Sequence, residues 1–214
     1  MEAGFWVESW ELGGTKTSFH LNRVHPHALA LAEREDLRGA RVLVPLCGKT
    51  LDMLFLAGHA AEVVGVELVP RAVREFFDDN GLDVVEERPG VFRSGNVVIH
   101  CADLFELTAA DLGPIDLVYD RASLIAFPEQ MRRRYTAKIV ELTRPGSRYF
   151  LNTLEYRPVL PEPPFAVGPD DVAGYYLDAF DIEHLHDEPK PEHRMVEKFG
   201  LDYLTEHGFL LTRR

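Results

Sequence analysis

Residues 41–67 read RVLVPLCGKTLDMLFLAGHAAEVVGVE, and their pattern indicates the fold class. The apolar run Arg41–Leu46 is typical of a strand buried on both faces, and Pro45 indicates that the strand ends there. Leu51–Gly58 has the apolar spacing of a helix and stops at a glycine. Glu62–Glu67 is a second apolar run and ends in an acidic residue. This order of strand, helix and strand predicts one βαβ unit of a parallel sheet.

The same alternation continues on both sides of this stretch. Further helices are expected at 26–35, 70–80, 128–142 and 170–179, and further strands at 91–93, 96–101, 116–120, 148–156, 180–185 and 208–212. We therefore predict an α/β fold with a doubly wound, mostly parallel sheet of about seven strands and helices on both faces. The last two strands are expected at the edge of the sheet, antiparallel if they form a hairpin-like pair. Four prolines between residues 158 and 164 predict an extended loop.

Length and charge limit the possible partners. The 214 residues suit one domain. With 23 basic and 35 acidic residues, the net charge of −12 argues against a nucleic-acid partner and against an anionic membrane surface. Two cysteines form no disulfide framework, and no signal peptide or membrane-spanning run is recognisable. We expect a cytoplasmic monomer with small-molecule partners.

Ligands of an open parallel sheet bind beyond the carboxyl ends of its strands. Glu67 stands at such an end, where its two carboxylate oxygens suit the vicinal hydroxyls of a ribose; the alternative is a carboxylate that only faces water. The first loop has Gly48 but lacks the G-x-G-x-x-G pattern that a pyrophosphate needs. This favours a ligand with a ribose and no phosphate, such as S-adenosylmethionine. Lys49 and Thr50 resemble a Walker motif, but a solvated helix start is the favoured interpretation.

Two further strand ends carry charged residues. Asp103 would accept a hydrogen bond from an adenine amino group or cap the turn before Phe105. Asp120 and Arg121 would form a structural ion pair, or Arg121 would bind a ligand carboxylate or the substrate.

Cysteine and histidine give weaker signals. Cys47 lies in the first loop without a matching histidine, so we interpret it as a packed thiol. His25 and His27, and likewise His184 and His186, are two residues apart, which is not the spacing of metal ligands on a helix. On a strand, the members of such a pair would share one face. We predict no metal site.

The motifs together resemble the thiopurine S-methyltransferase family of S-adenosylmethionine-dependent methyltransferases. The resemblance covers most of residues 5–180 and is most specific in Val44–Met53 (VPLCGKTLDM) and in Tyr119–Ala122 (YDRA). It includes the matches at Phe5, Trp6, Trp10, Phe19, His20, Gly58, His59, Val63–Glu67, Phe76, Phe77, Asp103–Phe105, Leu154–Tyr156 and Pro163–Phe165.

The resemblance implies roles for particular residues. Its cofactor contacts are Trp10, Leu46, Glu67 and Arg121, and with the strand-end analysis the expected cofactor-binding residues become Trp10, Leu46, Gly48, Glu67, Asp103 and Arg121. Phe19 and Arg121 are the expected catalytic residues, near the reacting sulfur and the acceptor. Residues 1–38 would cover the active site, residues 39–156 would bind the cofactor, and residues 157–214 would shape the acceptor side.

The function implied is methyl transfer from S-adenosylmethionine to an aromatic or heterocyclic thiol, with S-adenosylhomocysteine as the product. One alternative is the same fold acting on another soft nucleophile, such as a metabolite thiol, a selenium or tellurium species, or a natural-product intermediate. Another is a non-catalytic S-adenosylmethionine-binding module. A nicotinamide oxidoreductase is disfavoured by the missing glycines.

Overall fold

The computed structural model describes residue 4, residues 8–10 and residues 22–214. The chain divides into two compact units, residues 1–118 and residues 119–214, which are described in turn. Gly4 and residues 8–10 are helical. No helix among these described residues is long and apolar enough to cross a lipid bilayer.

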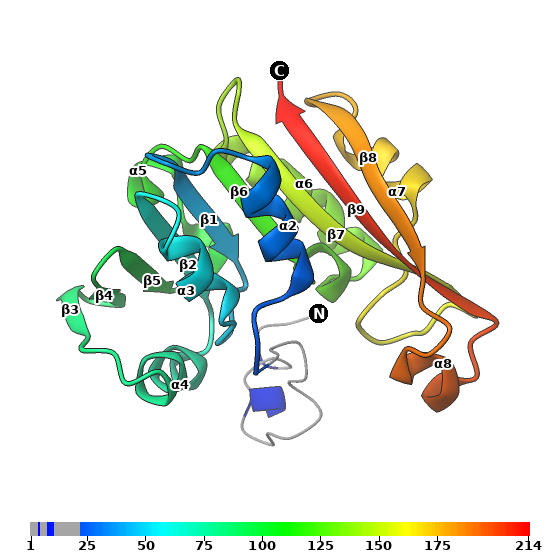
Figure 1. Cartoon of the computed structure of the whole chain (residues 1–214), viewed down its shortest axis with the longest axis horizontal. Helices are drawn as coiled ribbons and strands as arrows, with labels where there is room; N and C mark the ends of the chain where they lie inside the picture. Colours follow the sequence, from blue (N-terminus) through cyan, green and yellow to red (C-terminus); the bar gives the residue numbers. More distant parts are fainter. Residues whose placement is uncertain (1–3, 5–7, 11–21) are drawn as a thin grey trace. The chain divides into compact units, whose positions relative to one another are not determined.

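The first unit contains most of the parallel strands (Figure 1). Its strands are β1 (Arg41–Pro45), β2 (Glu62–Glu67), β3 (Val85–Arg88), β4 (Val91–Ser94), β5 (Val97–Cys101) and the start of β6 (Leu117–Arg121). Its helices are α2 (Pro26–Arg34), α3 (Asp52–Ala57), α4 (Pro70–Asp79) and α5 (Ala109–Leu112), with the 3₁₀ turn η2 (Leu104–Glu106). The strand order is β3-β4-β5-β2-β1-β6; β5, β2, β1 and β6 are parallel, and β3-β4-β5 is an antiparallel meander.

The central strands β1 and β2 are buried on both faces, as their continuous apolar runs predict. Gly65 in β2 shows how closely the first loop and α3 pack on this sheet. A β-carbon at Gly65 would lie 2.7 Å from Cε of Met53 and 2.8 Å from Sγ of Cys47. The thiol of Cys47 therefore fills the space that a missing side chain leaves.

The second unit is built on an antiparallel sheet (Figure 1). Its elements are the 3₁₀ turn η3 (Leu124–Ala126), α6 (Glu129–Leu142), β7 (Arg148–Arg157), α7 (Pro169–Tyr176), β8 (Phe180–Pro189), α8 (Arg194–Phe199) and β9 (Tyr203–Arg213). The strand order is β7-β9-β8. Tyr149 of β7, Tyr176 of α7 and Phe180 of β8 form an aromatic cluster with ring centroids 5.3 to 5.9 Å apart. Aromatic contacts thus fix α7 on one face of this sheet.

The expected helices and strands are confirmed to within a few residues, and the proline-rich stretch forms neither helix nor strand. Nine strands lie in the described part of the chain, where about seven were expected. The short strand β3 was not expected because all four of its residues are exposed, so its sequence carries no apolar pattern. The short helix α8 was also not expected. The prediction that the whole chain is one domain stays a prediction.

Replacing Gly65 by alanine should destabilise the protein by about 1–3 kcal/mol, because the new methyl group overlaps Met53 and Cys47. Urea unfolding of the wild type and of Gly65→Ala measures this difference. The matched control is Gly174→Ala in α7, where a β-carbon meets nothing within 4 Å. That substitution should stabilise the protein by about 0.5–1 kcal/mol, since alanine favours a helix. Equal effects at the two glycines would contradict the packing described for β2.

Candidate active site

Glu67, the last residue of β2, is at the centre of the candidate site. Its side chain is buried, with 7% of the residue exposed. Oε2 accepts a hydrogen bond of 2.8 Å from the backbone N–H of Gly48, and Oε1 accepts one of 2.8 Å from the backbone N–H of Val69. The carboxylate thereby connects the loop after β1 to the start of α4. The two oxygens together have four lone-pair directions, more than the backbone donors around them occupy, so the carboxylate retains capacity to accept a further hydrogen bond.

Two opposing effects act on the ionisation of Glu67. Burial raises the pKa of its carboxyl above the ordinary value. The backbone N–H groups of Val69, Gly48 and Leu68 lower the pKa by favouring the charged form, without cancelling the effect of burial. A donor that hydrogen-bonds to the ionised carboxylate would lower the pKa of Glu67 further.

The loop after β1 has an unusual backbone. Leu46 has a φ of 47° and Gly48 a φ of 52°, and a left-handed conformation is uncommon for a residue with a β-carbon. Between them, the N–H of Cys47 donates a 3.0 Å hydrogen bond to the carbonyl of Val66. Burial raises the pKa of the Cys47 thiol well above its ordinary value, so the thiol is a poor nucleophile. This supports the interpretation of Cys47 as a packed residue.

Trp10 lies against the same loop. Its buried side chain packs against Val69 and Ala72, close to the first turn of α4. Atom Cζ2 of the indole is 3.5 Å from the point where a β-carbon on Gly48 would stand. The first unit therefore brings together three of the predicted cofactor-binding residues: Trp10, Gly48 and Glu67.

The structure gives one function each to Lys49 and Asp103. Nζ of Lys49 forms ion pairs of 2.7 and 2.8 Å with Glu75 and Asp79 on α4, so Lys49 supports the fold and is not the solvated residue that the favoured interpretation predicted. Oδ1 of Asp103 accepts a 2.9 Å hydrogen bond from the N–H of Phe105 and caps η2. The capping role of Asp103 is therefore present, and contact with an adenine stays a prediction.

Asp120 and Arg121 end strand β6, and consecutive strand residues point to opposite faces. The carboxylate of Asp120 is fully buried and accepts hydrogen bonds from the hydroxyls of Tyr135 and Tyr149, at 2.6 and 2.7 Å. These two tyrosines were missed in the sequence, because they lie 15 and 29 residues beyond Asp120 and no local pattern links them to it. The role of Arg121 and that of Phe19, which lies outside the described residues, stay predictions.

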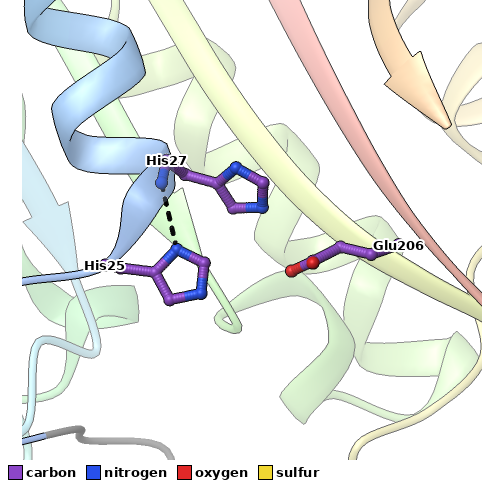
Figure 2. A group of neighbouring side chains, drawn as sticks. All are labelled: His25, His27 and Glu206. Carbon is purple, nitrogen blue, oxygen red and sulfur yellow. Dashed lines mark hydrogen bonds between the residues drawn. The ribbon is translucent and has the colours of Figure 1, made fainter. Parts of the chain in front are cut away.

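The two histidine pairs have different structural roles. The ring of His25 accepts a 3.2 Å hydrogen bond from the backbone N–H of His27 and caps α2 (Figure 2). His184 stands opposite Phe209 of β9 and stacks on its ring at 4.5 Å, whereas His186 stands opposite Gly208. The expectation that His184 and His186 share one face was wrong. A β-bulge between them inserts an extra residue, which turns the second ring to the other face.

Comparison with known sequences decides the family. A family profile described as "Thiopurine S-methyltransferase (TPMT)" matches residues 1–214. The thiopurine S-methyltransferase of Pseudomonas entomophila is 41% identical to this chain, and that of Shewanella sp. strain ANA-3 is 39% identical. Each match covers the whole of this chain and the whole of the relative. The chain belongs to the thiopurine S-methyltransferase family. It is thus an S-adenosylmethionine-dependent methyltransferase, and the family match extends beyond residues 5–180 to both ends of the sequence.

Solved structures show the same fold. A Burkholderia thailandensis 1,6-didemethyltoxoflavin-N1-methyltransferase, with 1,6-didemethyltoxoflavin and S-adenosylhomocysteine bound, superposes with a TM-score of 0.68 at 17% identity, covering 99% of this chain and 87% of that one. A structure reported for the conversion of a disulfide bond into a thioacetal group during echinomycin biosynthesis gives a TM-score of 0.66 at 18% identity, covering 99% and 93%. These likenesses confirm the predicted doubly wound α/β fold, which is the Rossmann-like fold of class I methyltransferases.

The raised pKa of Glu67 predicts how stability depends on pH in the cofactor-free protein. Above pH 4.5 the unfolded chain releases the proton of this residue while the folded chain still holds it. The free energy of unfolding of the wild type, relative to Glu67→Gln, should therefore fall as the pH rises through this window, by at most about 1.4 kcal/mol per pH unit. Chemical unfolding of both proteins between pH 4 and pH 8 measures it. A relative stability that rises with pH would contradict the assignment.

Proposed function

We propose that the protein transfers the methyl group of S-adenosylmethionine to the sulfur of a small aromatic or heterocyclic thiol, such as a thiopurine. The observation that carries this proposal is the match to the thiopurine S-methyltransferase family over the whole chain, with relatives of that name 36–41% identical over their full length. The net charge of −12 is consistent with a small-molecule acceptor. We further propose a cytoplasmic monomer that binds no nucleic acid.

The residues of the first unit fit the cofactor chemically. The carboxylate of Glu67 has more acceptor directions than the backbone donors around it occupy, and the two hydroxyls of a ribose are vicinal donors. In this proposal the hydroxyls bind Glu67, Leu46 and Gly48 border the cofactor, and Trp10 excludes water from it. Asp103 would accept from the adenine amino group through the oxygen that does not cap η2. Arg121 would contact both the cofactor and the acceptor.

The bound cofactor supplies an electrophilic methyl group on a sulfonium. In the proposed reaction the acceptor loses its thiol proton to water, and a sulfur lone pair then forms the new carbon–sulfur bond in line with the one that breaks. The breaking bond leaves its electrons on the departing sulfur, which becomes a neutral thioether, so no acid is needed. Aromatic thiols ionise more readily than cysteine, so no strong base is needed either.

The chain's own residues act by alignment and by charge. Holding donor and acceptor in line in a site that excludes water supplies part of the roughly 7–11 kcal/mol available from proximity and orientation. The guanidinium of Arg121 would stabilise the thiolate before attack. Phe19 would close the reacting centre from water.

The direct test is release of S-adenosylhomocysteine by the purified protein with S-adenosylmethionine and mercaptopurine. We expect release that depends on the acceptor and is absent from the control without it. Release with selenium or tellurium species or with other thiols, but not with mercaptopurine, would mean that the acceptor is another soft nucleophile and not the proposed aromatic thiol. Cofactor binding without release from any acceptor would contradict the proposed reaction and favour a binding module.

The ribose contact predicts that Glu67→Gln weakens cofactor binding about 10- to 100-fold, because a hydrogen bond to a charged acceptor is lost. Isothermal titration calorimetry with S-adenosylhomocysteine measures the change. Glu75→Gln is the matched control, since Glu75 lies in the same unit and pairs with Lys49. Its affinity should equal that of the wild type. An unchanged affinity of Glu67→Gln would remove Glu67 from the cofactor site.

A further inference from the structure

A buried carboxylate directly precedes Arg121 and has no part in the reaction described so far. Asp120 is completely buried in the second unit, and four donors surround its carboxylate. Oδ2 accepts from the hydroxyls of Tyr135 on α6 and Tyr149 on β7, and Oδ1 accepts from the backbone N–H groups of Ser123 and Leu124, at 2.9 and 3.4 Å. A carboxylate with this number of donors is fixed in one orientation.

The hydroxyl groups form an ordered chain. Tyr149 gives its single hydroxyl hydrogen to Asp120, so in the 3.0 Å contact between the hydroxyls of Tyr149 and Tyr176 the donor is Tyr176. Burial and the charge of Asp120 raise the pKa of Tyr135 and Tyr149 well above the ordinary value, so both remain protonated donors. Residues from α6 and β7 therefore converge on Asp120, and Tyr176 of α7 contacts Tyr149 without reaching the carboxylate.

The backbone beside Asp120 is strained. Ala122 has a φ of 74°, a conformation that a residue with a β-carbon rarely adopts and that persists only when the surroundings impose it. The bonds from Ser123 and Leu124 to Oδ1 of Asp120 enclose Arg121 and Ala122 in a closed turn. Beyond the turn, the carbonyl of Ile125 in η3 accepts a 2.7 Å hydrogen bond from the N–H of Phe165. The turn that carries Arg121 is thus held by Asp120 at its start and by Phe165 just beyond its end.

We propose that Asp120, held by Tyr135 and Tyr149, is a positioning residue that keeps the turn at Ala122 strained and so orients Arg121 toward the reacting groups. This inference rests on the proposed function, which places Arg121 in contact with cofactor and acceptor. If the two tyrosine hydroxyls are lost, the Asp120 carboxylate can rotate, the turn relaxes and Arg121 loses its orientation. The tyrosines thus act on the reaction only through Arg121.

A double-mutant cycle tests this dependence. Tyr135→Phe and Tyr149→Phe together remove both hydroxyls and keep the rings, and the pair is introduced into the wild type and into Arg121→Ala. We expect kcat/KM for the acceptor to fall about tenfold when Arg121 is present, because a small misalignment is costly. In the Arg121→Ala background the same pair should change kcat/KM by less than about twofold. Equal losses in the two backgrounds, or no loss when Arg121 is present, would overturn the proposal.

Tyr176→Phe is the matched control for a purely structural effect. It also removes a buried tyrosine hydroxyl, but the partner of that hydroxyl is Tyr149 and not Asp120. We expect a lower melting temperature with kcat/KM within about twofold of the wild type. If Tyr176→Phe lost as much kcat/KM as the paired variant, the buried hydroxyls would affect activity only through stability. That result would overturn the proposal.

A second readout does not depend on activity. Amide hydrogen exchange at Ser123 and Leu124 should be faster in the Tyr135→Phe, Tyr149→Phe protein than in the wild type, and unchanged exchange would overturn the proposal. Release of S-adenosylhomocysteine by the wild type is measured first, so a failure of the proposed function is detected before the cycle is interpreted. If no release is found, the proteins of the cycle are compared by their affinity for S-adenosylhomocysteine. Equal losses of affinity with and without Arg121 would contradict the proposal.

Discussion

The hydrogen bonds that Glu67 accepts from the N–H groups of Gly48 and Val69 are the constraint on which the rest of the candidate site depends. They hold the loop after β1 against the start of α4, at the carboxyl ends of two adjacent parallel strands. A buried carboxylate is tolerated there because backbone donors replace the water that it loses. The arrangement also leaves acceptor capacity for a ligand, so in the proposed function the interaction that stabilises the loop also prepares the binding of a ribose.

The loop itself is fixed by packing around β2. Gly65 leaves a gap in the strand, and the Cys47 thiol and Met53 occupy it. With Cys47 anchored, Leu46 and Gly48 on either side take left-handed backbone conformations that bring the loop close to Trp10. A residue that resembles a nucleophile in the sequence thus has a packing role, and burial accounts for its raised pKa.

The second unit repeats this principle with a different residue. Asp120 is a buried acceptor that fixes a strained turn, as Glu67 is a buried acceptor that fixes a loop. Its donors come from α6 and β7, so the orientation of Arg121 depends on segments far along the chain. This explains why the YDRA motif carries an aspartate that is not available to solvent. In both units a carboxylate accepts backbone N–H groups next to a residue assigned to the ligand.

The sequence by itself determined the order of helices and strands, the parallel core, the place of Glu67 and the family. Apolar periodicity and strand-end residues are local signals, and the motifs in Val44–Met53 and Tyr119–Ala122 are contiguous. Only the tertiary structure decided that Lys49 pairs with α4, that a bulge separates the faces of His184 and His186, and that two tyrosines hold Asp120. The physical reason is that the first and third of these contacts join residues distant in sequence, whereas the second depends on one inserted residue that shifts the alternation of side chains along a strand. Local composition indicates neither of them.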